Sequence, residues 1–500
     1  MNCCYYLYNI ALFPVKININ GAFISIFLLK NPSFRYLNLF HWGAIFSQTQ
    51  YFQPFQAQNS FLLLKTRKDK KMAILAINGG TKLIPEENKA LFHWPIVTEE
   101  DIAAVTDVLK EGSMSGNEIS KLFEKEYAAW NGTKYALSTA NGTAALTAAF
   151  WACGIGAGDE VICPSMTYWA SCAAVIKMGA TVNFADISED LNINPDDIEH
   201  RIGPRTKAII VVNYGAQPAD WQKIRAIADK YRLLVIEDNS HAQGALYQGK
   251  MCGSLGDISC ASLMSGKSLA IGEGGMICTD NRELFERCVA YGFYERTGVA
   301  SKFNKAESFI TDPALQKYAG IPMGGVKYRI NQTCAAMGRV QLKHYDERIA
   351  VIDKAMNYLC DLLDEIPGLK TIRPAKGTNT TKGGWYAAKG IYSEELTQKV
   401  SCAKFCEALQ AEGVFTFPGA NPPLHLSPLF HELDYFNQGK PTVIAFGQRD
   451  VRQGKGALPV SENLPARCFN LPWFKHFDQA AIETYAAAFR KVAENLDELV

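Results

Sequence analysis

The middle of the chain alternates between short apolar runs and longer segments with helical spacing. Residues 181–184, 207–212 and 233–235 are short and rich in aliphatic side chains, which predicts buried strands. Residues 219–231 place apolar side chains at the spacing of one helix face. Strands that alternate with helices are typical of parallel sheets covered on both faces. The pattern therefore predicts an α/β fold with a mainly parallel, doubly wound sheet.

The same pattern predicts two folded domains. Residues 72–329 hold the alternating strands and helices and would form the large domain. Residues 330–500 would form a smaller C-terminal α/β domain, which begins with a long helix running to Leu363. We expect the stretch between residues 295 and 323 to be an irregular loop, because it is polar and lacks periodicity.

Residues 1–71 differ in composition from the rest. They hold 15 Phe, Trp and Tyr residues and no Asp or Glu before Asp69. Their apolar runs are shorter than the roughly 20 residues that a membrane helix needs, and neither a signal peptide nor a transit peptide fits them well. We expect Met72 to start the folded protein. Residues 1–71 would be a disordered extension or a mis-assigned leader.

Composition narrows the class of protein. The formal net charge is +1 and 48% of the residues are hydrophobic, which describes a soluble globular chain without the basic excess that nucleic-acid binding requires. The 14 cysteines include no Cys-x-x-Cys pair. Scattered cysteines at this length predict buried thiols in a reducing compartment such as the cytoplasm, with no disulfide framework and no metal site.

The strongest chemical signal lies around Lys267. This lysine stands between a β-prone segment and the turn Gly272-Glu-Gly-Gly275. A phosphate-binding P-loop would need glycine at position 261 and a following helix, but Ala261 and the glycine turn stand there. The other chemistry of such a lysine is a Schiff base, in which burial lowers the pKa from about 10.4 toward about 7–8 and the amine condenses with an aldehyde. An isolated lysine is more often a surface residue, so the hypothesis needs a second group.

Asp238 supplies the second group. It follows the apolar run at residues 233–236, and a carboxylate at the C-terminal end of a parallel strand points into the crevice where open α/β sheets bind ligands. Pyridoxal 5'-phosphate needs both residue types: a lysine for its aldehyde and an acid that keeps its pyridine nitrogen protonated. Lys267 and Asp238 are therefore candidate catalytic residues.

Four linked motifs carry a resemblance to a known family. Glu237-Asp-Asn-Ser-His-Ala-Gln-Gly-Ala245, Gly253-Ser-Leu-Gly-Asp257, Ser262-x4-Lys267 and Gly272-Glu-Gly-Gly275 together resemble the DegT/StrS-type sugar aminotransferases, which are fold type I pyridoxal phosphate enzymes. The resemblance begins near Ala76 and continues almost to the C-terminus. It implies a large cofactor-binding domain, a smaller C-terminal domain and a homodimer.

The resemblance also implies a set of cofactor-binding residues. Gly142 and Thr143 open an alanine-rich helix whose N-terminus suits the cofactor phosphate, and the hydroxyl of Ser262 would join them. The full implied cofactor set is Gly142, Thr143, Tyr168, Asp238, His241, Ser262, Lys267 and Lys327. The loop Asn421-Pro-Pro-Leu-His425 resembles one near the substrate entrance, so His425 is a candidate substrate contact.

Three positions leave alternatives open. The aromatic residue over the pyridine ring would be Tyr168, with Trp169 as the alternative. Many family members have Asn at the position of Lys327, which approaches the phosphate of the neighbouring subunit, and a lysine could serve that dianion as a point charge. Asn421 stands where an aromatic residue is common, which bears on substrate choice.

The function implied is transfer of an amino group from glutamate or glutamine to a keto-sugar, expected to be nucleotide-linked, or to a keto-cyclitol. The enzyme would use pyridoxal phosphate bound to Lys267 and need neither nucleic acid nor membrane. One alternative is a sugar dehydratase of the same fold, which carries His in place of the lysine. Another is a non-catalytic cofactor-binding regulator, because a fold alone does not imply catalysis.

Overall fold

The computed structural model describes residues 12–19, 22–29, 74–86, 88–300 and 307–500. The chain divides into two units, residues 1–68 and 69–500. The first contains an antiparallel pair of strands, β1 (Leu12–Ile19) and β2 (Ala22–Leu29). The other residues of the expected extension, and Met72 itself, lie outside the described residues, so the expectation of disorder stays a prediction.

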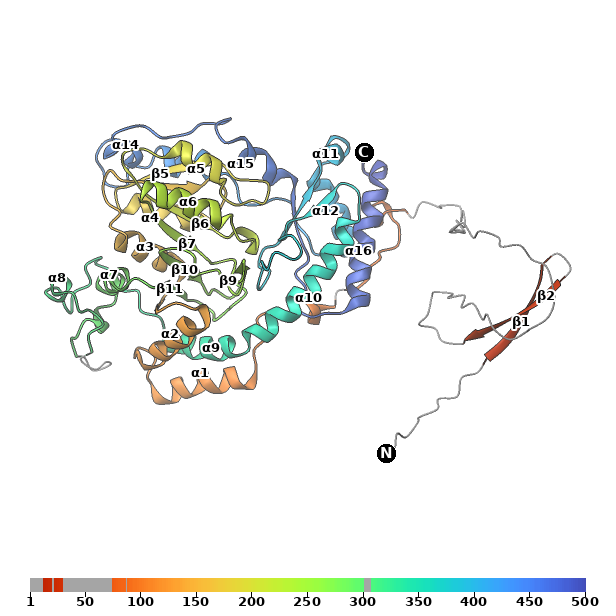
Figure 1. Ribbon diagram of the computed structural model, residues 1–500, viewed down its shortest axis with the longest axis horizontal. Helices are drawn as coiled ribbons and strands as arrows, with labels where there is room; N and C mark the ends of the chain where they lie inside the picture. Colours follow the sequence, from red (N-terminus) through yellow and green to blue (C-terminus); the bar gives the residue numbers. More distant parts are fainter. Residues whose placement is uncertain (1–11, 20–21, 30–73, 87, 301–306) are drawn as a thin grey trace, which may run out of the picture. The chain divides into compact units, whose positions relative to one another are not determined.

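A seven-stranded sheet forms the centre of the second unit (Figure 1). In the order in which they lie in the sheet, its strands are β3 (Tyr135–Thr139), β11 (Gly275–Thr279), β10 (Ile258–Ser262), β7 (Leu234–Asp238), β6 (Thr206–Val212), β4 (Glu160–Pro164) and β5 (Thr181–Ala185). Only β11 runs against its neighbours. The predicted mainly parallel α/β sheet is confirmed.

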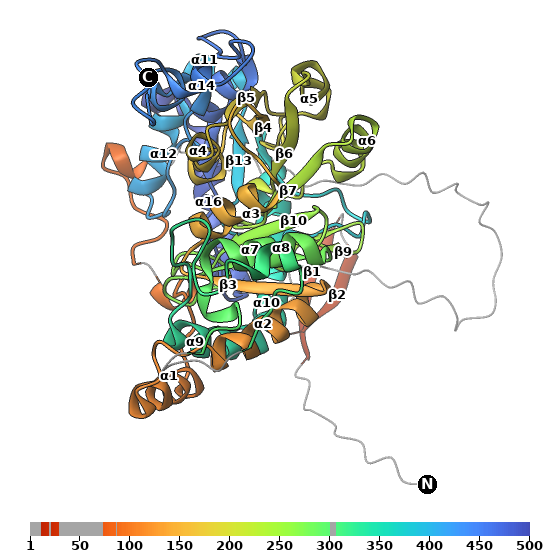
Figure 2. The same ribbon diagram turned by 90° about the vertical axis from the view of Figure 1, so that its left-hand side faces the viewer.

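Side chains of each strand alternate between two apolar layers. In β6, Ile210 packs on one side while Ile209 and Val211 pack on the other, as the period of two in a strand requires. One face is covered by α3 (Gly142–Ala152), α4 (Ala170–Lys177) and α7 (Arg282–Gly292), and the other by α2 (Glu118–Asn131), α5 (Pro195–Arg201) and α6 (Trp221–Tyr231). Figure 2 shows α2 next to β3. Helices on both faces explain why these strands are almost wholly apolar.

The sheet places the ends of several strands at one edge. Asp238 is the last residue of β7 and Ser262 the last of the adjacent, parallel β10. Gly275, the first residue of the reversed strand β11, pairs with both Ser262 and Thr139. Residues far apart in the sequence therefore meet at the carboxyl edge, where α/β sheets bind ligands.

The C-terminal part contains a second, antiparallel sheet. Its strands are β12 (Leu369–Thr371), β13 (Lys389–Tyr392) and β14 (Cys468–Asn470), and the helices around it are α10 (Tyr345–Asp364), α11 (Glu394–Lys399), α12 (Cys402–Ala411) and α16 (Gln479–Glu494). Buried side chains of α10, α12 and α16 form one core with this sheet. This part of the chain thus combines helices with a sheet of its own, and the smaller α/β domain at residues 330–500 stays a prediction.

The long helix expected up to Leu363 is two helices. His344 separates α9 (Gln332–Lys343) from α10, because its φ of −102° and ψ of 2° are not helical. α9 packs against α1 (Glu99–Glu111) and α2, whereas most of α10 packs in the C-terminal core. The expectation of one helix was wrong because the apolar spacing of the sequence continues across the break. Figure 1 labels the two helices α9 and α10.

Two segments cross the proposed domain boundary at residue 330. Leu75, Ile84 and Leu91 are buried in the C-terminal core, although in sequence they belong to residues 72–329. In the other direction, Leu424 and Leu458 are buried in the core of the large domain. The division into residues 72–329 and 330–500 thus stays a proposal. In it, each part contributes one segment to the hydrophobic core of the other.

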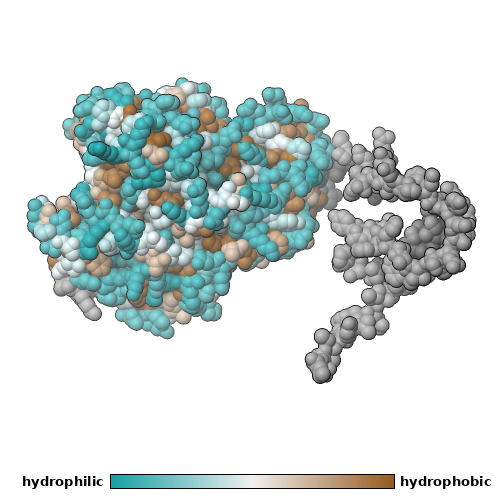
Figure 3. All heavy atoms as spheres, in the orientation of Figure 1, coloured by the Kyte–Doolittle hydropathy of each residue, from teal (hydrophilic) through white to brown (hydrophobic). Residues whose placement is uncertain are grey.

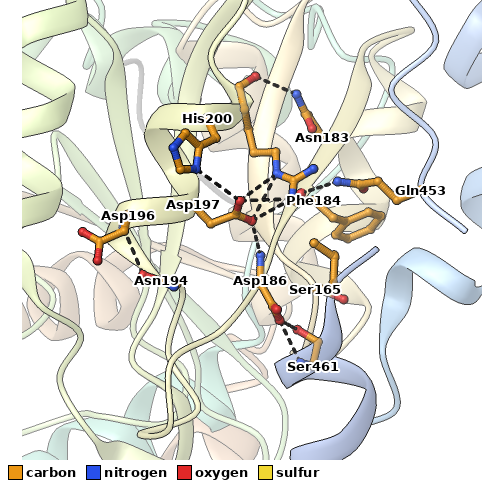
Figure 4. A network of polar contacts seen from close by, with 12 residues as sticks. Ser165, Asn183, Phe184, Asp186, Asn194, Asp196, Asp197, His200, Gln453 and Ser461 are labelled. Atoms are coloured by element: carbon orange, nitrogen blue, oxygen red, sulfur yellow. Dashed lines mark hydrogen bonds and ion pairs between the residues drawn. The ribbon is translucent and has the colours of Figure 1, made fainter. Parts of the chain in front are cut away.

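Polar contacts fasten the second of these segments to the large domain (Figure 4). It includes α13 (Pro428–His431), α14 (Thr442–Ala445) and α15 (Pro459–Asn463). The backbone N–H and the hydroxyl of Ser461 donate to Asp186 Oδ1 at 2.8 and 2.7 Å, and Gln453 donates to the carbonyl of Phe184 at 2.6 Å. These bonds attach the segment to the end of β5.

On the face drawn in Figure 3, hydrophilic residues surround smaller groups of hydrophobic ones. Among the described residues, no helix is both long enough and apolar enough to cross a bilayer.

We expect a shortened chain that begins at Met72 to unfold at the same temperature as the full chain, because it keeps the buried side chains of Leu75, Ile84 and Leu91. A chain that begins at residue 95 is the matched comparison. It loses three buried side chains worth about 2 kcal/mol each, and Glu412 loses the backbone N–H donors of Ala76 and Leu83. Thermal unfolding of all three chains checks this, and a lower midpoint for the Met72 chain would contradict it.

Candidate active site

The carboxyl edge of the large sheet borders a cavity of about 760 Å³. Seven of the nine predicted site residues line it: Gly142, Thr143, Tyr168, Asp238, His241, Ser262 and Lys267. Residues from the C-terminal sheet and its loops close the other side, among them Tyr386, Lys389, Gly419, Asn421 and Asn470. The cavity is therefore built by both proposed domains.

Lys267 is buried, with 8% of its surface exposed. The tight turn after β10 holds its backbone, because its N–H donates to the carbonyl of Met264 at 2.8 Å and its own carbonyl accepts from Trp94 Nε1 at 2.9 Å. Its amine lies 4.2 Å from the ring centroid of Tyr386. Burial lowers the pKa of Lys267 to about 8, against the opposing attraction of Asp238. A substantial fraction of the amine is therefore neutral near pH 8 and able to act as a nucleophile.

Asp238 lies at the end of β7, with 4% of its surface exposed. Its Oδ2 accepts from the hydroxyl of Ser171 at 2.7 Å and its Oδ1 from the N–H of Ser240 at 3.0 Å. Ser171 has one hydroxyl proton, so the 3.1 Å contact with Thr167 is a bond in which Thr167 donates. These bonds fix the orientation of the carboxylate toward the cavity.

His241 is buried and lines the same cavity. Its Nδ1 accepts from the N–H of Gly215 at 3.3 Å, which places the ring proton on Nε2. Burial lowers the pKa of His241 well below its usual value, and the charges of Lys267 and Lys389 act in the same direction. The imidazole therefore stays neutral and offers an N–H donor.

The N-terminus of α3 lies against the end of β10. Asn141 caps the helix by accepting from the N–H of Ala144 at 2.9 Å, which leaves the first-turn amides of Gly142 and Thr143 without intrahelical partners. A Cβ on Gly142 would lie 2.8 Å from Ser262 Cβ, closer than carbon atoms pack. The absence of a side chain at position 142 brings these amides next to Ser262, and such a helix N-terminus is suited to a phosphate.

Comparisons with known proteins agree with this geometry. The model of the DegT/DnrJ/EryC1/StrS aminotransferase family matches residues 95–490. The chain belongs to this family. A relative named spore coat polysaccharide biosynthesis protein SpsC, from Bacillus subtilis, is 36% identical over 81% of this chain and 97% of its own. The L-glutamine:2-deoxy-scyllo-inosose aminotransferase of Streptoalloteichus tenebrarius is 30% identical over 85% of this chain and 99% of its own.

Solved structures give the same assignment. The aminotransferase from Psychrobacter cryohalolentis has a TM-score of 0.68 and 28% sequence identity, covering 81% of this chain and 99% of its own. The predicted family and the fold type I architecture are both confirmed.

Tyr168 and Trp169, the two candidates for the aromatic residue over the cofactor ring, line different pockets. Tyr168 lines the cavity with Lys267. Trp169 lines a neighbouring pocket of about 520 Å³ together with Lys327. The geometry therefore favours Tyr168 as the aromatic residue of the cavity.

Two of the predicted site residues, Lys327 and His425, do not line the cavity. Lys327 is exposed in the neighbouring pocket, which shares Asn141 and Thr143 with the cavity. His425 is buried, with Nδ1 2.6 Å from the hydroxyl of Ser165 and Nε2 3.1 Å from Glu462. Both ring nitrogens are thus held by the protein, and the predicted substrate contact of His425 has no support in this geometry.

Sequence reasoning missed Ser171, Tyr386 and Lys389. Ser171 is the second residue of α4, and its bond to Asp238 joins residues that are 67 positions apart in the chain, so no local pattern indicates it. Tyr386 and Lys389 come from the C-terminal part, where the chain order gives no indication of contact with Asp238. The one sequence signal for Lys389 is its position inside the apolar run at residues 385–392.

We expect Gly142→Ala to lower both stability and affinity for pyridoxal phosphate. The added methyl must displace Ser262, and overpacking of this kind costs about 1–3 kcal/mol. Gly156→Ala is the matched control, because a Cβ there meets nothing within 4 Å. Chemical unfolding measures the stability, and absorbance titration with pyridoxal phosphate measures the affinity. Equal stability and equal affinity of the two variants would contradict the explanation that Gly142 is required by its close contact with Ser262.

Proposed function

We propose that this protein is a pyridoxal phosphate-dependent aminotransferase that moves an amino group from glutamine or glutamate to a keto-sugar or keto-cyclitol. The observation that carries the proposal is the placement of Lys267 and Asp238, both buried, in one cavity at the carboxyl edge of the sheet. The names of family members support the substrate class, because one is an L-glutamine:2-deoxy-scyllo-inosose aminotransferase and another a GDP-perosamine synthase.

The residues present fit the cofactor. The cavity offers an amine with a lowered pKa at Lys267, a buried carboxylate at Asp238 and a helix N-terminus beside Ser262. Gly142, Thr143 and Ser262 would hold the phosphate, and Tyr168 would lie against the ring. His241 would donate its Nε2 proton to an oxygen of the ring. Bound there, pyridoxal phosphate would supply the electron sink that transamination requires.

The protein's own groups then have separate roles. Lys267, in its neutral form, would hold the aldehyde carbon of the cofactor and, after displacement by the donor amine, move a proton from the donor α-carbon. Asp238 would keep the proton on the pyridine nitrogen, since Ser171 and the Ser240 amide hold the carboxylate in place. The cavity walls from both proposed domains would limit the access of water to the amine.

Each alternative function can be distinguished from transamination by one feature of the chain. A dehydratase of this fold would carry His at the position of Lys267, and this chain has the lysine. A non-catalytic regulator would not need a lysine with a lowered pKa in a cavity of this size, whereas transamination does. We further propose a cytoplasmic location, supported by the twelve described cysteines, which are all free thiols.

We also propose that the active protein is a homodimer. Lys327 is exposed, and the pocket that it lines shares Asn141 and Thr143 with the cavity. A lysine at this place is available to the phosphate site of a second subunit. The apolar side chains of Trp169, Leu429 and Leu433 border the same pocket and suit an isologous contact.

The test of the central proposal is covalent labelling. Borohydride reduction of the protein loaded with pyridoxal phosphate should attach the cofactor to a peptide containing Lys267. Lys382 and Lys475 are internal controls, because burial lowers their pKa to about 7 and about 6, yet neither lines the cavity. Capture of the aldehyde should speed up as pH rises toward about 8, because the pKa of Lys267 is about 8 and the neutral amine reacts.

The matching variants separate the two catalytic roles. Lys267→Ala should bind the cofactor without transamination, and Asp238→Asn should still be labelled but lose at least about a hundredfold in rate, about 2.7 kcal/mol in the barrier. Labelling of another lysine, or transamination by Lys267→Ala at the wild-type rate, would refute the proposal.

The dimer proposal predicts complementation between damaged subunits. Lys267→Ala and a variant with Lys327→Glu should each be inactive, and mixing them should restore part of the activity if Lys327 serves the partner's phosphate site. Absence of restoration, in mixtures shown by mass labelling to exchange subunits, would count against a shared site.

A further inference from the structure

Lys389 is a charged residue on a strand face that is otherwise apolar. It is the first residue of β13 and pairs in register with Asn470 of β14. Two residues further on the same face, Ile391 is buried in a cluster that includes Val212 and Tyr214 of the large domain. A lysine between two packed domains loses most of its hydration, and burial lowers the pKa of Lys389 to about 8.

The protein compensates only part of this charge. The ammonium of Lys389 donates to the carbonyl of Gly419 at 3.0 Å and to Asn470 Oδ1 at 2.7 Å. Both acceptors are neutral, and an ammonium has three N–H donors. Among the residues that the structure describes, no carboxylate lies within ion-pair distance of Lys389. With a pKa of about 8, the Lys389 amine is mostly protonated at neutral pH, and its two neutral acceptors leave one N–H donor suited to an anion from outside the protein.

The position of Lys389 points to that partner. Lys389 lines the same cavity as Lys267 and Asp238. His241, whose pKa the charges of both lysines lower, lines this cavity as well. A molecule that presents an amine to Lys267 can therefore present a neighbouring anion to Lys389.

We propose that Lys389 is the ionic anchor for a carboxylate of the amino donor, in the first place its α-carboxylate. The proposal rests on the proposed aminotransferase function and names a residue that determines donor specificity. The α-carboxylate is common to glutamate and glutamine, whereas a keto-cyclitol bears no acid. Anchoring it would select α-amino acids over simple amines and orient the donor α-carbon.

The test uses two donors that differ only in charge, L-glutamine and its α-amide. The absorbance change of the cofactor on amino transfer gives the half-saturation concentration for each. Wild-type protein should prefer the acid, and Lys389→Gln should lose about tenfold or more of this preference. The loss should come from weaker saturation by L-glutamine, with the α-amide unchanged. Lys389→Arg should keep the preference.

Lys382→Gln is the matched control. Lys382 is also buried, donates to the carbonyl of Ile372 at 2.7 Å and lies outside the cavity. Its substitution should leave the preference for the acid intact. If Lys389→Gln does not fold, as judged by thermal unfolding, Lys389→Met replaces it, because methionine keeps the apolar stem without the charge.

A second donor pair identifies which carboxylate is held. Lys389→Gln could remove the preference between L-glutamate and L-glutamine and keep the preference for L-glutamine over its α-amide. In that case Lys389 still anchors a carboxylate, but it is the side-chain carboxylate of the donor. If binding of the acid, of the α-amide and of the keto-acceptor weakens equally, Lys389 only holds Gly419 and Asn470 together. That result overturns the proposal. Unchanged preferences in both pairs would overturn it as well.

Binding of glutarate separates this inference from the proposed function. Calorimetric titration needs no turnover: wild-type protein should bind glutarate, and Lys389→Gln should bind it about tenfold or more weakly. If this difference is found but no amino donor changes the cofactor spectrum, the anchor stands and the aminotransferase proposal fails. If amino transfer proceeds while Lys389→Gln keeps both preferences, the aminotransferase proposal stands and the anchor fails.

Discussion

The burial of the Lys267 amine is the constraint on which the site depends. Taking an ammonium out of water is costly, and the pKa of Lys267 falls to about 8 because the neutral form is cheaper to bury. Asp238 opposes this shift through its charge, but a hydrogen-bonded ion pair between them would restore a fully charged lysine. The structure instead occupies Asp238 with Ser171 and the Ser240 amide. The carboxylate is thereby satisfied without direct pairing, and the amine remains reactive.

The topology of the large sheet is enough to bring the residues of the site together at one edge. Parallel strands all end at the same edge, so Asp238 and Ser262 meet there as terminal residues of neighbouring strands. The reversed strand β11 begins at that edge with Gly275, where any Cβ would lie 2.5 Å from the carbonyl oxygen of Asn141. Gly142 gives a second close approach, to Ser262. Two glycines thus let the start of α3 lie close against the sheet.

The sequence allowed the large sheet and the centre of the site to be predicted, because these depend on local patterns. The strand ending at Asp238 is an apolar run followed by a carboxylate, and the environment of Lys267 is a glycine-rich turn; both can be read within a few residues. The break at His344 was not predictable in this way, since its backbone angles interrupt an apolar spacing that continues on both sides. The outward position of Lys327 and the bonded ring of His425 also depend on contacts between distant segments.

The C-terminal wall of the cavity shows why long-range packing matters for specificity. Tyr386 and Lys389 reach the cavity because β13 packs its Ile391 against Val212 and Tyr214 of the large domain. The same apolar contact that joins the two sheets therefore sets the position of the Tyr386 ring beside Lys267 and of the Lys389 amine. A change in how the domains pack would move these groups relative to Asp238 while leaving the strand-end carboxylate in place. The large sheet thus fixes the positions of Lys267 and Asp238, whereas the packing of the C-terminal sheet fixes which groups lie opposite them in the cavity.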